Sequence, residues 1–151
     1  MAAYERALRL LTIHARGRQD LARGLERRGF RPGAIREALD RLDREGWLDE
    51  LGAARSLVRA KGDRYGRARL QRELASRGFA EATIVAALSE RTAEEEEKNL
   101  AGAFARLWKA SAGLERQRRR GRVSRALARR GFSGDAISAM MKACDEGLDL
   151  G

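Results

Sequence analysis

The sequence is short of the residue types on which enzymes and extracellular proteins depend. Its 151 residues include one histidine, His14, and one cysteine, Cys144. A single cysteine excludes a disulfide framework and a cysteine-based metal site. A single histidine excludes a histidine cluster, and Cys144 has no visible histidine partner that would activate it as a nucleophile. A GxxxxGK[ST] phosphate loop is also absent. We therefore expect a protein that is not an enzyme, with no catalytic residue, no cofactor and no bound metal.

Long apolar runs are missing as well. Glu5, Arg6 and Arg9 interrupt the first ten residues, so these contain no apolar signal core. No apolar run elsewhere in the sequence reaches the length of a transmembrane helix. We therefore expect a soluble cytoplasmic protein that has no membrane partner.

Charge and helix-forming residues are in excess. Charged residues make up 36% of the chain, and the formal net charge is +10, mostly from arginine. Abundant Ala, Leu, Arg and Glu, together with a single proline, favour helix and predict an all-α fold. The positive balance favours a polyanionic partner, nucleic acid first. Arginine-rich codon usage is the alternative explanation of the same balance.

One motif occurs three times, at residues 21–35, 70–84 and 123–137. Each copy reads apolar-x-x-x-Leu-x-x-Arg-Gly-Phe-x-x-x-x-Ile, and the glycines are separated by 49 and 53 residues, which is typical of a repeat array. The first two apolar positions share one helix face. Glycine then closes the helix in the left-handed conformation, and the phenylalanine folds back on that face before a new helix begins. The predicted structural corners are Gly29, Phe30, Gly78, Phe79, Gly131 and Phe132.

The motif predicts nine helices in three tandem three-helix repeats with helix-turn-helix-like units. We expect an elongated, curved monomer without strands. A first helix over residues 3–14 is expected to place Leu8, Leu11 and Ala15 on one face, with Leu10 and Tyr4 beside it. The predicted repeats span residues 1–46, 47–91 and 92–151.

Local signals set several helix boundaries. Thr92 and Glu95 have the spacing of a capping box. Asp49 and Ser133 are good N-caps, and Pro32 suits a first helical position. The acids around Glu95 are attributed to the positive end of the helix that follows rather than to a metal site. The helices bounded by these signals are predicted over residues 32–44, 50–60 and 93–110.

The cations gather in the middle and last repeats. Residues 1–50 carry eleven cations and nine acids, whereas residues 116–130 carry eight arginines and no acid. Helix starts at 64–69 and 118–122 occupy equivalent places in their repeats, so stacking would align them beside a cleft for a phosphate backbone or an acidic protein surface. The alternative is a solvated face without a partner. The residues assigned to this contact are Lys61, Arg64, Tyr65, Arg67, Arg69, Arg72, Arg116, Arg118, Arg119, Arg120 and Arg122.

Aromatic residues are scarce, at 5% of the chain. The corners account for three phenylalanines and the core for Phe104. Tyr65 is the one aromatic residue that we expect to be exposed among cations. Sequence-specific reading of single strands by base stacking is therefore not expected.

Read in order, the three corners resemble the RecX family of recombination regulators. The stretch AYERALRLLTIHARGRQDLARGLERRGF resembles the family's opening, and GWLDELGAARSLVRAKGDRYGRARLQRELASRGF its most typical segment. The stretch RQRRRGRVSRALARRGFSGDAI resembles its basic third repeat, so the resemblance covers nearly the whole chain. Gln19, Glu50 and Gly52 depart from the family pattern. These departures affect local capping and packing, and they remove no group that the function would need.

The resemblance implies a non-enzymatic negative regulator of the RecA recombinase, active in DNA repair and the SOS response. Family members bind the RecA–DNA filament and suppress its ATPase, coprotease and strand-exchange activities. Many also bind single- and double-stranded DNA with little regard to sequence. The basic residues named above would then contact RecA or the DNA of the filament.

Two other functions fit the residues. A helix-turn-helix-like DNA-binding protein that acts alone, for example as a repressor, is compatible with glycine corners between helices. Against this reading, no helix shows a clear set of base-reading residues. A purely structural helical adaptor is the third possibility. A footprint at one duplex site without RecA would favour the repressor, and no retention on DNA at low salt would favour the adaptor.

Overall fold

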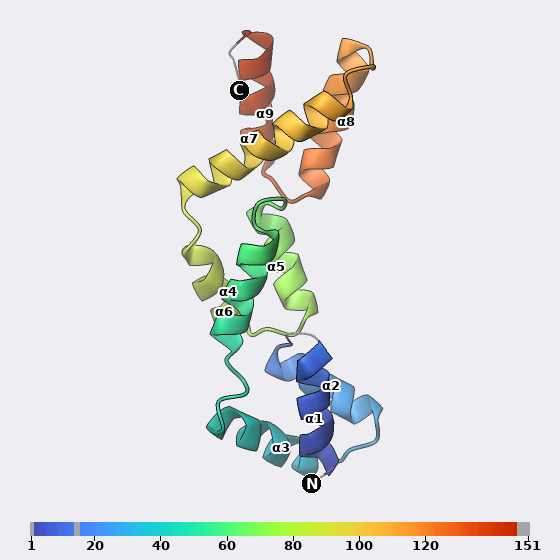
Figure 1. Ribbon diagram of the computed structural model, residues 1–151, viewed down its shortest axis with the longest axis vertical. Coiled ribbons are helices and arrows are strands. Elements are labelled where there is room, and N and C mark those ends of the chain that lie inside the picture. Colours follow the sequence, from blue (N-terminus) through green and yellow to red (C-terminus); the bar gives the residue numbers. More distant parts are fainter. Residues whose placement is uncertain (1, 14–15, 148–151) are drawn as a thin grey trace. The chain divides into compact units, whose positions relative to one another are not determined.

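The computed structural model describes residues 2–13 and 16–147 of the 151-residue chain. Across this part of the chain the backbone forms nine helices and no strand (Figure 1), which confirms the all-α prediction. Within the described residues, no helix combines the length and the hydrophobicity that a membrane-spanning segment requires. The helices are α1 (Ala2–Ile13), α2 (Arg18–Arg27), α3 (Pro32–Arg44), α4 (Glu50–Lys61), α5 (Arg67–Ser76), α6 (Glu81–Ser89), α7 (Ala93–Ala110), α8 (Arg116–Arg129) and α9 (Gly134–Asp145).

The three Arg-Gly-Phe corners have the predicted construction. Gly29, Gly78 and Gly131 have φ values of 87°, 78° and 89°, in the left-handed region that favours glycine. After each glycine, the phenylalanine N–H donates 3.2 Å to the carbonyl of the second motif leucine, which closes the preceding helix. The phenylalanines of the second and third corners are buried, and that of the first is half-buried.

Most of the predicted helix boundaries are also confirmed. Thr92 and Glu95 form a reciprocal capping box at the start of α7. The Ser133 hydroxyl accepts a hydrogen bond from a backbone N–H of α9, and Asp49 accepts one from the first turn of α4. Pro32 occupies the first position of α3. These capping signals act within one helical turn, which is why the sequence alone reveals them.

The predicted inner face of α1 is confirmed only in part. Leu8 and Leu11 are half-buried and pack against the core, whereas the fully buried residues are Ala3, Ala7 and Leu10. The true stripe follows the same helical spacing but uses small alanines, which allow α1 to approach α2 and α3 closely. Ala15, which the prediction placed on the same face, lies outside the described residues, as does His14, the predicted last residue of the helix.

The chain divides into two compact units. The first unit contains the described residues up to Leu57 together with residues 73–89. The second unit contains residues 58–72 and the described residues from Glu90 onward. The predicted middle repeat therefore contributes to both units. The repeat boundaries at 46/47 and 91/92, like the elongated form, stay predictions.

Each unit is built around a core at which three helices meet (Figure 1). In the first unit, α1, α2 and α3 supply Ala7, Leu10, Leu21, Leu25, Ile35, Leu39 and Leu42. In the second unit, α7, α8, the third corner and α9 supply Leu100, Ala103, Phe104, Val123, Leu127, Phe132, Ile137 and Met141. The apolar positions of the first and third copies of the motif thus point into these cores, as their spacing predicts. Those of the second copy, Leu70, Leu74, Phe79 and Ile84, are buried as well.

In the first unit, the start of α2 packs against the second corner. The Gly17 N–H donates to the Arg77 carbonyl at 2.9 Å, and the N–H of Arg18 donates to the Glu50 carboxylate. A Cβ atom on Gly17 would lie 2.0 Å from the Gly78 carbonyl oxygen, so the close approach requires glycine. We call this contact the first joint.

The second unit repeats this construction at the start of α5. The Gly66 N–H donates to the Arg130 carbonyl at 2.7 Å, and the N–H of Arg67 donates to Glu96 Oε1 at 3.0 Å. A Cβ atom on Gly66 would lie 2.5 Å from the Gly131 carbonyl oxygen. This second joint fixes the start of α5 against the third corner, beside α8.

Candidate functional site

A basic cleft of about 830 Å³ lies within the second unit. One side is formed by the α4–α5 connection and the start of α5, and the other by the end of α7 and by α8. Apolar side chains of α7 and α8 form part of its lining, and no acidic residue lines it. The arginines that line the cleft are Arg64, Arg69, Arg122, Arg129 and Arg130.

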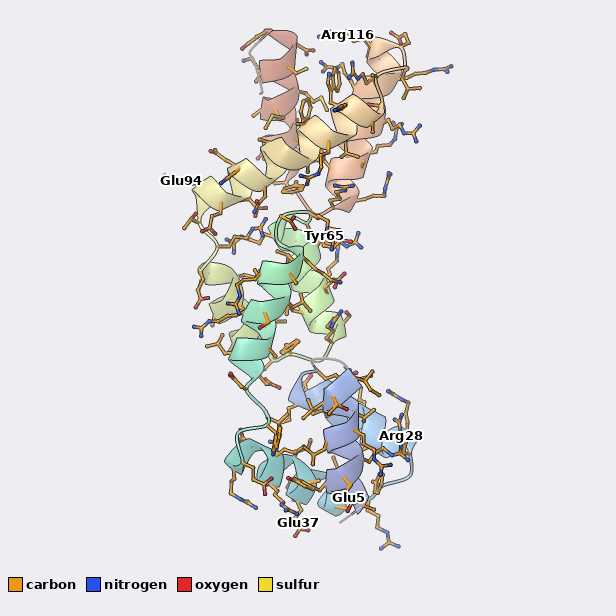
Figure 2. All side chains as sticks on the ribbon, in the orientation of Figure 1. Glu5, Arg28, Glu37, Tyr65, Glu94 and Arg116 are labelled. Atoms are coloured by element: carbon orange, nitrogen blue, oxygen red, sulfur yellow. The ribbon has the colours of Figure 1, made fainter. Side chains whose placement is uncertain are left out.

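Tyr65 stands among these cations on the α4–α5 connection (Figure 2). The Arg69 guanidinium lies 4.3 Å from the centre of its ring, and the Arg64 guanidinium lies 5.8 Å away. Arg69 Nη1 also donates 3.2 Å to the Arg129 carbonyl. The ring attracts the cations through its negative face without neutralising them. The arginines therefore stay in the cleft with their full positive charge.

Three of the predicted α8 cations make contacts elsewhere in the second unit. Arg119 Nε donates 3.0 Å to the Trp108 carbonyl, and its guanidinium lies 3.9 Å from the Trp108 ring centre. Arg116 pairs with Asp145 at 2.9 Å, and Arg120 pairs with the same carboxylate. Hydrogen bonds from Arg120 and then from Arg116 lower the pKa of Asp145. These three cations tie α8 to α7 and α9.

The cleft thus contains only part of the predicted set. Arg64, Tyr65, Arg69 and Arg122 line it together. Lys61 is located near the Tyr65 ring, 6.0 Å from its centre, but does not line the cleft. The remaining predicted residues, which also lie outside its lining, are Arg67, Arg72, Arg116, Arg118, Arg119 and Arg120.

Sequence reasoning omitted two arginines that the cleft contains, Arg129 and Arg130. Both belong to the acid-free run at 116–130, which is the sequence feature that could have identified them as part of the site. The helix dipole alone is enough to explain an arginine before each corner glycine, so these positions do not stand out. The second joint brings these two residues opposite the start of α5, which no local pattern reveals.

Among the described residues, no group of three or more His, Cys, Asp and Glu side chains is arranged to hold a metal ion. Cys144 is half-buried and packs against the core of the second unit. The cleft, by contrast, brings five arginines together without an acid in its lining.

Comparisons with known proteins identify relatives of the whole chain. The family model for the first three-helix domain of RecX matches residues 3–42, and that for the third matches residues 94–141. A regulatory protein RecX of Halorhodospira halophila is 37% identical, over 99% of this chain and 92% of its own. One of Streptomyces coelicolor is 35% identical, over 92% of this chain and 76% of its own.

Solved structures share the fold. The crystal structure of RecX from Lactobacillus salivarius superposes with a TM-score of 0.78 at 20% identity, covering 96% of each chain. A second crystal structure of a regulatory protein RecX gives a TM-score of 0.80 at 23% identity, over 93% of this chain and 72% of that one. The three-helix architecture is therefore common to proteins whose sequences have diverged widely.

Proposed function

The chain belongs to the RecX family, and we propose that it is a non-enzymatic negative regulator of the RecA recombinase. In this proposal it acts in the cytoplasm as a monomer, within DNA repair and the SOS response. It binds the RecA–DNA filament and suppresses the ATPase, coprotease and strand-exchange activities of RecA. It also binds single- and double-stranded DNA with little regard to sequence.

The observation that carries this proposal is the basic cleft of the second unit. Five arginines line it and no acid does. Arginine matches phosphate and carboxylate groups through a planar fork of N–H donors, and its charge does not titrate near neutral pH. Neutralising phosphates releases counterions, so binding to DNA depends strongly on salt and little on sequence. An acidic surface of RecA would be held by the same donors.

The test is to titrate the protein into DNA-stimulated RecA ATPase. We expect inhibition at near-stoichiometric ratios, and we expect the double variant Arg64→Ala, Arg122→Ala to lose most of it. The matched control is Arg125→Ala, Lys142→Ala, which removes the same charge from exposed positions of α8 and α9 outside the cleft. This control should keep inhibition close to that of the unaltered protein.

Two outcomes would contradict the proposal. If the unaltered protein had no effect on the ATPase at these ratios, the RecA assignment would fail. If both double variants inhibited equally well, the cleft would not be the contact. A footprint at one defined duplex site in the absence of RecA would instead support a DNA-binding protein that acts alone.

A further inference from the structure

One buried charge has no part in the function proposed so far. Arg91 lies in the connection between α6 and α7 and is only 6% exposed, the one buried charged residue among the described residues. Burying a guanidinium is costly unless it is paired with an opposite charge and its donors are satisfied. The contacts of Arg91 therefore indicate what its burial achieves.

The donors of Arg91 are directed at the α4–α5 connection. Its Nη2 donates 2.9 Å to the carbonyl of Tyr65, and its Nε donates to Glu96 Oε2 in the first turn of α7. A Cβ atom on Gly62 would lie 2.8 Å from Arg91 Nη1 and 2.4 Å from the Val58 carbonyl oxygen. The guanidinium is therefore held against the backbone of this connection.

Glu96 completes a ring of hydrogen bonds. Its second oxygen, Oε1, accepts the N–H of Arg67 at 3.0 Å, which is the bond of the second joint. Arg67 Nη2 in turn donates 2.9 Å to the carbonyl of Arg91. Arg91 holds the carbonyl of Tyr65 and Glu96 holds the N–H of Arg67, so the backbone is fixed on both sides of Gly66, directly after Arg64 and Tyr65.

We propose that Arg91 and Glu96 are positioning residues, which together form a clasp that sets the geometry of the basic cleft. The clasp holds the α4–α5 connection so that Arg64 and Arg69 face the arginines of α8 across the cleft. Neither residue lines the cleft, so neither contacts the polyanion. The inference rests on the proposed function, because it assumes that the cleft binds a polyanion.

The clasp predicts a result opposite to that of simple electrostatics. Removing an acid raises the net charge, and on charge alone it would strengthen binding to a polyanion. The clasp predicts instead that Glu96→Gln weakens binding, because Arg91 loses its counter-ion and the connection is no longer held. The matched control is Glu94→Gln, which makes the same charge change at an exposed position in the same helical turn (Figure 2).

The experiment measures fluorescence anisotropy of a short labelled single-stranded oligonucleotide over a series of salt concentrations. We expect Glu96→Gln to bind about fivefold more weakly at low salt, with a salt slope reduced by about 0.7 for each phosphate that the cleft no longer neutralises. Glu94→Gln should bind at least as tightly as the unaltered protein. Arg91→Lys keeps the net charge but removes the guanidinium fork, so it should weaken binding in the same direction.

Circular dichroism and thermal unfolding establish that each variant is folded at the temperature of the binding measurement. If Glu96→Gln does not fold, the affinity of Arg91→Lys for the oligonucleotide tests the clasp instead. Equal affinities and salt slopes for Glu96→Gln and Glu94→Gln, or an Arg91→Lys variant that binds normally, would overturn the clasp. The Arg64→Ala, Arg122→Ala variant distinguishes a failure of the clasp from a failure of the cleft as the polyanion site. If it too binds the oligonucleotide normally, the cleft itself is not the polyanion site.

Discussion

The two joints have the same backbone construction but differ in the charge of the side chains beside them. The spacing of the repeats aligns Arg16 and Asp20 of the first unit with Tyr65 and Arg69 of the second. In the first unit, Arg16 Nη1 and Asp20 Oδ2 pair at 2.6 Å, so the two charges cancel. In the second unit, Arg69 lies over the ring of Tyr65, and its charge is retained. Each joint is held by a glycine, a backbone carbonyl and one glutamate. The charge of the neighbouring surface residues can therefore differ between the two joints.

The second and third corners differ in charge in the same way. Arg77 of the second corner lies 4.0 Å from Glu73 on the preceding helical turn. The third corner has Arg129 and Arg130 at its equivalent place, and both line a cleft without acids. The same fold thus forms a charge-balanced joint in the first unit and a strongly positive one in the second. We infer that the first joint is structural and that the second also binds the partner.

The largest expected effect is on stability, at the corner glycines. A Cβ atom would lie 2.4 Å from Asp20 N at Gly78 and 2.3 Å from Arg69 N at Gly131, whereas at Gly29 it would meet nothing within 4 Å. Gly78→Ala and Gly131→Ala should each lower the free energy of unfolding by about 3 kcal/mol or more, because strain and a backbone clash add. Gly29→Ala should cost only about 1 kcal/mol, from its positive φ.

Urea unfolding monitored by circular dichroism checks this order, with Gly29→Ala as the matched control. Equal losses of stability at all three corners would show that the joints add no constraint beyond the left-handed conformation. A milder loss at Gly78 than at Gly131 would show that the first joint yields more readily than the second.

A charge exchange between the joints should have the next largest effect, on affinity for DNA. Arg69→Asp places an acid in the cleft and removes the cation over Tyr65, so oligonucleotide binding at low salt should weaken about tenfold or more. Asp20→Arg breaks the pair with Arg16 in the first unit but leaves the cleft unaltered, so affinity should stay within about twofold of that of the unaltered protein.

Anisotropy titrations of both variants test this exchange at matched salt concentrations. If Asp20→Arg strengthened binding as much as Arg69→Asp weakened it, net charge alone would control the affinity. The distinction between a structural joint and a binding joint would then be wrong.

The smallest effect concerns pH, at one exposed carboxylate in each unit. Hydrogen bonds from Tyr4 and then Arg41 lower the pKa of Glu45 in the first unit, and bonds from Arg120 and then Arg116 lower that of Asp145 in the second. A carboxylate with a lowered folded-state pKa stabilises the protein above its unfolded value of about 4. This stabilisation is lost as the pH falls through the lowered value.

Carbon-detected NMR titration should therefore find both carboxyls ionising below the ordinary range for their residue types. The variants Glu45→Gln and Asp145→Asn should each flatten the acid side of the profile of melting temperature against pH. Because both groups are exposed, the change should be slight. An Asp145 that titrates at the ordinary value would argue against the ties between α8 and α9.

The helices, corners and caps of this protein can be predicted from local patterns in its sequence. Those features depend on contacts within one or two turns, such as the left-handed glycine at each corner and the capping box of Thr92. The three copies of one motif also carried the resemblance to the RecX family. The concentration of arginine in the later part of the chain is also visible in the sequence, because counting charges requires no knowledge of the distances between them.

Packing between distant segments determines which arginines share a cleft and what holds them there. Arg69 and Arg129 are 60 residues apart in sequence, and the second joint brings them together. Nothing in the local pattern around Arg91 indicates that it is buried or that its donors hold a segment 26 residues away. Local sterics and hydrogen bonding fix each helix, whereas the convergence of charges depends on how distant segments pack.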